Sequence, residues 1–134
     1  MKKYLINIFV LAMSFGCNAN VIELTILLKC NLKNDTVLLA EYNDLEFVIN
    51  KDSRTYITKI EDVLYSNTFR FQSEYTIVKL SNNIHIFKNF DATFGDVIEY
   101  GIINSHGEID TCKSVISESF STSIVTFKRD DSGF

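Results

Sequence analysis

Three cysteines are the residues of this chain best suited to covalent chemistry. They stand at positions 17, 30 and 112 of a sequence of 134 residues. Cys17 falls in an N-terminal segment with the features of an export signal, and removal of that segment would leave Cys30 and Cys112 as a pair. Two cysteines in an oxidising compartment normally form a disulfide. We therefore expect a Cys30–Cys112 bridge, with two buried free thiols as the alternative if the chain is not exported.

The histidines and carboxylates are weaker candidates for catalysis or metal binding. His85 stands in an expected strand and His106 at an expected turn, and neither has a second ligand at a spacing typical of metal sites. Acidic pairs such as Asp44 and Glu46 fall in or beside turns, where carboxylates are normally solvated. The chain has no Gly-x-Ser-x-Gly nucleophile motif. We predict no catalytic residue, no metal ligand and no cofactor; an enzyme would need His85 to meet an acid and a hydroxyl in one cleft.

The first 19 residues have the composition of an export signal. Lys2 and Lys3 give a positive start, Tyr4–Phe15 is mostly apolar, and Ala19 supplies a small residue at the expected cut site. The apolar stretch of about a dozen residues is too short to cross a bilayer, which takes about 20. We predict that residues 1–19 are removed and that the mature protein is periplasmic or secreted.

A lipid anchor on Cys17 is the alternative fate of this segment. Bacterial lipoproteins place Gly or Ala directly before the modified cysteine, and Gly16 fits that rule. The third residue before the cysteine is usually Leu, and here it is Ser14. We therefore expect no stable membrane anchor unless Cys17 is lipidated.

The charge balance excludes some partners. The chain has 13 Lys and Arg against 17 Asp and Glu, and loss of Lys2 and Lys3 leaves 11 against 17, a net charge of −6. Such a protein repels nucleic-acid phosphates and anionic lipid headgroups, so we predict no nucleic-acid binding. A protein partner, and a basic one in particular, fits the charge; the alternative is that the acidity only keeps the chain soluble.

The remaining sequence has the pattern of an all-β domain. Short runs of β-branched, aromatic and aliphatic residues end every eight to twelve residues or so at Asn, Asp, Ser or Gly. The chain has no proline and no linker, so we expect one domain over residues 20–128 and a polar tail over 129–134. About eight to ten short strands must hide their edges in a small antiparallel barrel or sandwich. The expected strands are Val21–Cys30, 36–42, 45–49, 54–60, 68–72, 75–80, 84–88, 97–103, 109–113 and 122–128, with 61–67 left open between a loop and a helical turn.

Alternation along these strands predicts which side chains face the core. The bridge is expected to join the first and last parts of the sheet, as in barrel closure. The tyrosines carry polar tips and are the expected interface residues. The inward set is Ile22, Leu24, Ile26, Leu28, Cys30, Leu45, Phe47, Ile49, Phe69, Phe71, Phe87, Phe90 and Phe94, and the interface set is Tyr42, Tyr56, Tyr65, Tyr75 and Tyr100.

A resemblance to known proteins rests on two short motifs. The stretch Cys30-Asn31-Leu32-Lys33-Asn34, an alternating strand and the late Cys112-Lys113 together resemble a family of small, exported, uncharacterised proteins of Gram-negative bacteria, over residues 28–113. The resemblance implies an antiparallel β domain, periplasmic location, a bridge and no known activity. This chain departs from the family pattern by having Asp35 where Gly is usual, and its continuation past Cys112 leaves the role of residues 114–134 open.

These observations favour a binding function. Size, acidity and expected architecture also give a looser likeness to periplasmic lysozyme inhibitors, from which no residue can be carried over. We expect a non-catalytic periplasmic protein that inhibits or neutralises another protein, as lysozyme inhibitors and immunity proteins do. The alternative is a carrier of a small apolar ligand in a barrel interior lined by Leu45, Phe47 and Phe69.

Overall fold

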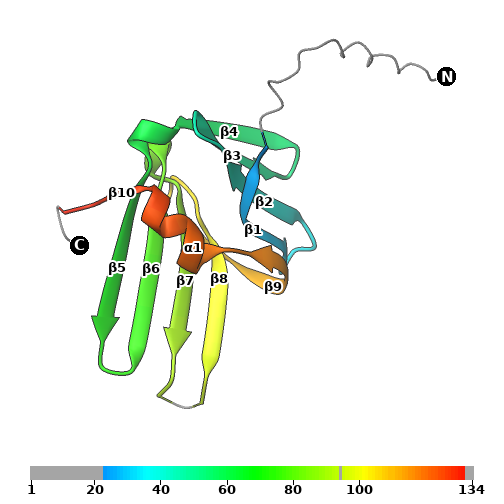
Figure 1. Ribbon diagram of the computed structural model, residues 1–134. Coiled ribbons are helices and arrows are strands. Elements are labelled where there is room, and N and C mark those ends of the chain that lie inside the picture. Colours follow the sequence, from blue (N-terminus) through cyan, green and yellow to red (C-terminus); the bar gives the residue numbers. More distant parts are fainter. Residues whose placement is uncertain (1–22, 94, 132–134) are drawn as a thin grey trace, which may run out of the picture.

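The computed structural model describes residues 23–93 and 95–131, and most of them lie in β-strands (Figure 1). The predicted export segment lies outside the described residues, as does Phe94. The undecided stretch 61–67 divides between a 3-10 turn and the start of a strand. The strands are β1 (Thr25–Leu32), β2 (Val37–Tyr42), β3 (Glu46–Lys51), β4 (Arg54–Lys59), β5 (Leu64–Arg70), β6 (Ser73–Lys79), β7 (His85–Asp91), β8 (Val97–Ile103), β9 (Ile109–Glu118) and β10 (Lys128–Arg129), with helix α1 (Phe120–Ser123) and the 3-10 turns η2 (Ile60–Asp62), η3 (Ser81–Asn83) and η4 (Ile124–Thr126).

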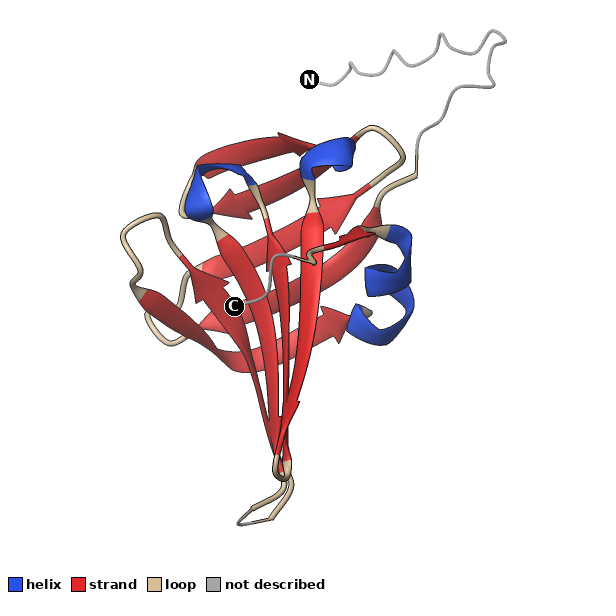
Figure 2. Cartoon of the chain, turned by 90° about the vertical axis from the view of Figure 1, so that its left-hand side faces the viewer, coloured by secondary structure: helices blue, strands red, loops and turns tan. Residues whose placement is uncertain are grey.

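The all-β class is confirmed, and the strands form one curled sheet. Its order is β10-β5-β6-β7-β8-β9-β1-β2-β3-β4. The bend lies in β9, where residues 109–111 pair with β8 and residues 112–118 pair with β1. The two halves of the sheet therefore turn towards each other as a half-barrel around the core, as the two views show (Figures 1 and 2). The ends of the sheet, β10 and β4, do not pair with each other.

Three of the hairpin turns use the residues that the sequence predicts for them, whereas the turn at Phe71 and Gln72 lies inside the predicted strand 68–72. Asp35, Asn82 and Gly107 adopt φ angles of 69°, 64° and 83°. Asn, Asp and Gly tolerate this left-handed region, which tight turns between antiparallel strands require. The predicted hairpins at 34–35, 81–83 and 104–108 are therefore present.

The Cys30–Cys112 disulfide is confirmed, but it does not join the two ends of the sheet. The two Cα atoms lie 5.8 Å apart across the neighbouring strands β1 and β9. Because β9 pairs with β1 in the middle of the sheet, the bridge lies at the bend between its two halves. The expectation of barrel closure by the bridge is wrong, and the bond instead links the adjacent strands β1 and β9 at the bend.

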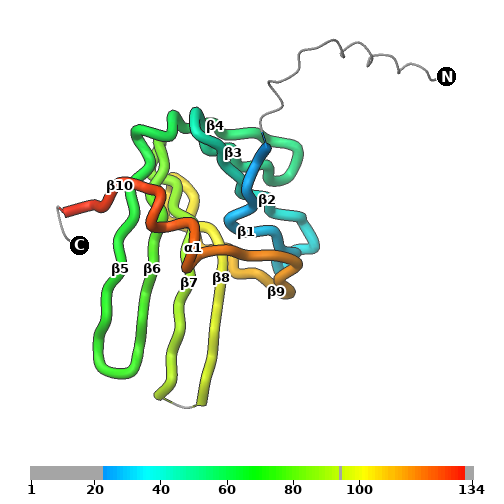
Figure 3. The backbone as a smooth tube through the Cα atoms, viewed as in Figure 1, coloured from blue at the N-terminus to red at the C-terminus, as the bar shows by residue number. Residues whose placement is uncertain are grey.

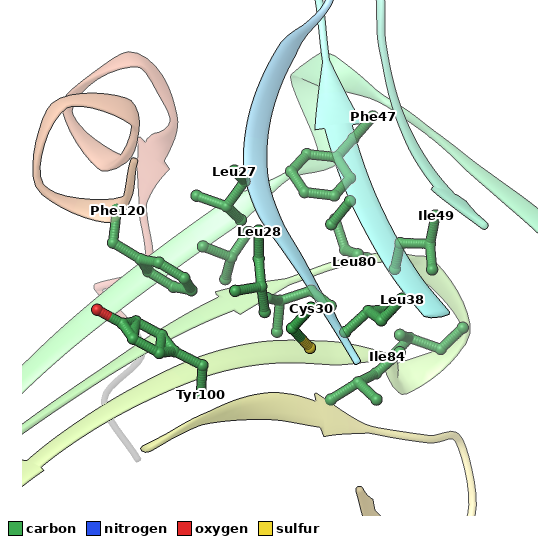
Figure 4. Close-up of a cluster of buried hydrophobic side chains, with 14 of the residues drawn as sticks. Leu27, Leu28, Cys30, Leu38, Phe47, Ile49, Leu80, Ile84, Tyr100 and Phe120 are labelled. Carbon is green, nitrogen blue, oxygen red and sulfur yellow. The ribbon is translucent and has the colours of Figure 1, made fainter. Parts of the chain in front are cut away.

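The core fills the space between the two halves of the sheet (Figure 4). Phe47 and Ile49 are buried as predicted. In β1, however, strict alternation fails: Leu27 and Leu28 are both fully buried, and Leu24 is 46% exposed. The register of β1 against β2 shifts between Ile26 and Leu28, which places an extra residue on one strand. A bulge of this kind changes the facing of every residue before it.

The predicted strand over 122–128 is wrong, since this stretch holds α1 and η4 before the two-residue strand β10. Phe120 begins α1, and Phe127 directly follows η4. Both rings are buried, Phe120 at 5.6 Å from Tyr100 and Phe127 at 4.9 Å from Tyr42 (centroid distances). The tube view shows this C-terminal segment, residues 119–131, passing over one face of β6–β8 and reaching the edge of β5 (Figure 3).

Candidate protein-binding surface

The far ends of β5–β8 project beyond the rest of the molecule and carry exposed apolar side chains. Figure 1 shows these strands continuing past α1 and β9. Phe69 is 74% exposed and Phe71 is 99% exposed, so the prediction that both side chains pack in the core is wrong. Alternation assigns a side chain to a face of the sheet, but whether anything covers that face depends on the fold. We call Phe69, Phe71, Val97 and Ile98 the apolar tip.

Phe69 and Ile98 of the apolar tip lie on the face of the sheet that also forms the core, whereas Val97, next to Ile98 in β8, points to the other face. In register, Phe69 lies opposite Glu74, Glu74 opposite Phe90, and Phe90 opposite Ile98. Cross-strand neighbours on one face contact each other directly. This row is thus a continuous surface that the C-terminal segment leaves uncovered, and Ile98 remains 51% exposed.

A polar row separates the apolar tip from the core. Asn67 Nδ2 donates to Glu74 Oε2 and Thr76 Oγ1, each at 3.0 Å. Lys88 Nζ lies 6.0 Å from the centroid of the Tyr100 ring, a cation–π arrangement. Asn67 Oδ1 is buried without a hydrogen-bond partner among the described residues. These contacts fix the side chains just above the tip, so the exposed residues stand on an ordered base.

Phe71 has an unusual backbone for an aromatic residue. It stands with Gln72 in the turn between β5 and β6, which the Arg70–Ser73 pair closes, and has a φ of 56°. Left-handed φ angles are uncommon outside Gly, Asn and Asp, and a bulky residue there is strained. The ring gains no packing in return, because it is almost fully exposed. The turn thus holds a large apolar side chain in solvent at a conformational cost.

The opposite face of the same hairpin carries a shallow groove. Its volume is about 400 Å³ and its surface is mostly apolar. Below it, Ile77 and Phe87 are 8% and 5% exposed, and the Tyr75 and Phe87 ring centroids lie 6.1 Å apart. Partial burial raises the pKa of Tyr75. The groove is lined by Ser66, Thr68 and Arg70 of β5 and by Ser73, Tyr75 and Ile77 of β6.

The tyrosines expected at an interface have mixed positions. Tyr42 and Tyr65 pack against the core, and Tyr100 is buried against Phe120. Tyr56 also packs against the core, at the border of a polar cleft, and Tyr75 lines the groove.

The sequence contains one signal for the exposed apolar tip. Arg70-Phe71-Gln72 connects two strands without the Gly or Asn that the turn geometry favours.

His85 lies in β7 near a lysine–aspartate ion pair. It lies opposite Lys79 in the sheet, and Lys79 Nζ is 2.6 Å from Asp130 Oδ2. Partial burial, and secondly the charge of Lys79, hold the pKa of His85 below its ordinary value. A carboxylate partner would shift that pKa in the opposite direction.

His106 lies apart from His85, in the turn between β8 and β9. Its backbone N–H donates to Asn104 Oδ1 at 2.9 Å. The residue borders a polar cleft of about 260 Å³ together with Arg54 and with Lys51, whose Nζ lies 2.8 Å from Asp110 Oδ2. Across residues 23–93 and 95–131, no group of three or more His, Cys, Asp or Glu side chains could hold a metal ion.

The ligand cavity expected from Leu45, Phe47 and Phe69 does not form from these residues. Phe47 is buried in the core, whereas Leu45 is 66% exposed and Phe69 is 74% exposed. Leu45 lies in the turn just before β3 and Phe47 in β3, whereas Phe69 lies in β5, so the three side chains do not line one interior space.

Comparison with known proteins gives no relative from which to carry over a function: no family model, no curated protein and no solved structure matches this chain. None of the helices in the described part of the chain has the length and apolar character needed to cross a membrane.

Proposed function

We propose that this protein is an exported, non-catalytic binding protein that neutralises another protein through the apolar tip. The observation that carries the proposal is Phe71, whose ring is 99% exposed on a backbone with a φ of 56°. Strained backbone geometry concentrates at active sites, ligand clamps and switch regions, where the strain is part of the mechanism. The predicted export segment and the disulfide support a location outside the cytoplasm.

The chemistry of the tip fits a protein partner. Aromatic side chains are over-represented at the centres of protein interfaces, where burial of one ring contributes strongly to affinity. Burying a Phe side chain is worth about 1.5–3 kcal/mol. The formal charge of −4 on the full chain would increase the rate of encounter with a basic protein. Basic muramidases and toxins directed at the cell wall are therefore the partner class that we propose.

The test uses the purified protein from residue 20 onwards and a panel of muramidases and periplasmic toxins. We expect one of them to form a complex in size-exclusion chromatography and to lose activity in it. Phe71→Ser should weaken that complex at least tenfold. Leu45→Ser is the matched control, because Leu45 is also an exposed apolar residue but lies away from the tip. Absence of any complex, or equal affinities of the two variants, would contradict the proposal.

A further inference from the structure

We propose that the partner inserts an extended segment as an additional strand beside β5, along the part of its edge that β10 leaves open. This inference rests on the proposed function and specifies how the partner is held. The segment would run end to end with β10 and place alternate side chains over the groove on the β5–β6 hairpin.

The first support is the unpaired edge of β5. In the described residues β10 pairs only with Leu64 and Tyr65. The backbone N–H of Asp130 donates to the Tyr65 carbonyl oxygen at 2.8 Å, which shows that the polar groups of Tyr65 point away from β6. Because these directions alternate along a strand, the N–H and C=O groups of Asn67 and Phe69 point the same way. Such a row of free backbone groups is a template for another strand.

The second support is the groove, because the β5 residues that line it are every second residue of that strand. Ser66, Thr68 and Arg70 line it from the edge strand itself. Side chains of an added strand also alternate between the two faces, so every second one would lie over this groove. In this recognition mode the backbone bonds provide affinity and the alternate pockets provide specificity.

The other edge of the sheet is less suited to this role. β4 begins with Arg54 and ends with Lys59, and charged residues on an edge strand oppose pairing with other chains. The cleft beside Arg54 is polar. The open part of β5 has only Arg70 as a charged residue, at its last position.

The occupant follows from these side chains. Ser66 and Thr68 are small and leave room for apolar side chains opposite them. Arg70 is exposed, so a carboxylate facing it on the added strand would stabilise the complex, because unlike charges on neighbouring strands attract each other. A second copy of this chain is a poorer occupant, since chains of net charge −4 repel each other. The occupant is thus a partner segment that alternates apolar and polar residues and carries an acidic residue facing Arg70.

Synthetic peptides test this directly. The probes are alternating Val/Thr peptides of about seven residues, a typical strand length, with a single Asp or Lys at the position facing Arg70. We expect the Asp peptide to bind the protein, as followed by NMR titration, and the Lys peptide to bind more weakly. Arg70→Glu should reverse this preference, whereas Arg54→Glu on the other edge should leave it unchanged. Equal binding of both peptides to the unmodified protein, or no binding, would overturn the inference.

A second pair of variants distinguishes binding through the backbone edge of β5 from binding through the apolar tip. Phe69→Pro removes both the ring and the outward N–H, whereas Phe69→Val removes the ring and keeps that N–H; proline is tolerated on an edge strand where its nitrogen faces outwards. We expect about tenfold weaker binding of the full partner to Phe69→Pro than to Phe69→Val, the effect of one lost backbone hydrogen bond. Thermal unfolding of both variants checks that they fold. A partner complex that is weakened by Phe71→Ser but equal for the two Phe69 variants would retain the proposed function and remove strand addition.

Two further outcomes would assign the edge to a different occupant. Sedimentation that shows a dimer disrupted by Phe69→Pro would identify a second copy of the chain. Peptide binding that appears only after deletion of residues 132–134 would identify the chain's own last residues. Either result would overturn the proposal of a partner strand.

Discussion

At the scale of single residues, Phe71 is a position where a substitution should increase stability and weaken partner binding. Its φ of 56° suits Gly, and its ring makes almost no contact within the molecule. Phe71→Gly should therefore raise the free energy of unfolding by about 1 kcal/mol, because relief of strain exceeds the entropy cost of a glycine. Urea unfolding measures the change. Asn82→Gly, at a φ of 64°, is the control and should change stability less, since Asn tolerates this conformation. A Phe71→Gly protein that is less stable than the unmodified one would show that the turn is not strained.

His85 should make the stability of the protein depend on pH near neutrality. Burial and the charge of Lys79 lower the pKa of His85 in the folded state. The unfolded chain then binds a proton at a higher pH than the folded chain does. As the pH falls through the ordinary histidine pKa of about 6.5, the free energy of unfolding should therefore decrease, and it should level off below the folded-state pKa.

Denaturant unfolding between about pH 8 and 5.5 checks this dependence, a range chosen to stay above the carboxylate pKa values. His85→Gln should remove the decrease. His106→Gln should retain it, because His106 lies in an exposed turn. A decrease that survives in His85→Gln would assign the pH dependence to another group.

At the scale of elements, the C-terminal segment acts as a cover over the open side of the half-barrel. Phe120 is 1% exposed, and Tyr42 Oη donates to Ser123 Oγ at 2.8 Å. Phe120→Ala should lower the free energy of unfolding by about 3–5 kcal/mol, because it leaves a cavity beside Tyr100. Val125→Ala is the control from the same segment and should change stability by less than about 0.5 kcal/mol, since Val125 is 74% exposed. Equal small effects in the two variants would mean that the segment is not docked in solution.

The disulfide links β1 to β9 at the bend of the sheet. It closes a loop between positions 82 residues apart, and this constraint on the unfolded chain is worth about 4–5 kcal/mol by the loop-closure argument. The double variant Cys30→Ala and Cys112→Ala should lose about that much stability in urea unfolding, and reduction of the unmodified protein should have a similar effect. A loss below about 1 kcal/mol would indicate that the unfolded chain retains structure between these strands.

At the scale of the whole molecule, sequence patterns predicted the strands and turns better than they predicted which side chains are buried. Alternating runs and Asn- or Asp-containing turns identified nearly every strand, because strand period and turn geometry are local properties. The cysteine pair also followed from the sequence. The exposed positions of Leu45 and Phe69 did not, because exposure depends on which element packs over a face. The bulge near Leu27 shifted the predicted facing, and residues 122–128 were predicted as a strand where α1 and η4 precede β10.

The candidate site could not be predicted from these patterns, because it too depends on how the elements pack. A groove beside a free edge exists only because β10 ends after two residues and the sheet fails to close, both of which are properties of the complete fold. The unusual turn residue Phe71 was visible in the sequence, but alternation assigned its ring to the core.

The location of the molecule remains a prediction that one experiment decides. The export segment begins with Lys2 and Lys3 and places a small residue, Ala19, at the expected cut site. When the full chain is expressed in a Gram-negative host, mass spectrometry of the periplasmic fraction should find Asn20 as the first residue and no free thiol, since Cys17 is removed and the other two cysteines are bonded. Ala19→Glu should block cleavage, because the peptidase accepts small side chains there, and the uncut chain should accumulate in the membrane fraction. A chain that begins at a lipid-modified Cys17, or an uncut chain with reactive thiols in the cytoplasm, would place this binding surface in a different compartment and change the class of partner that it can meet.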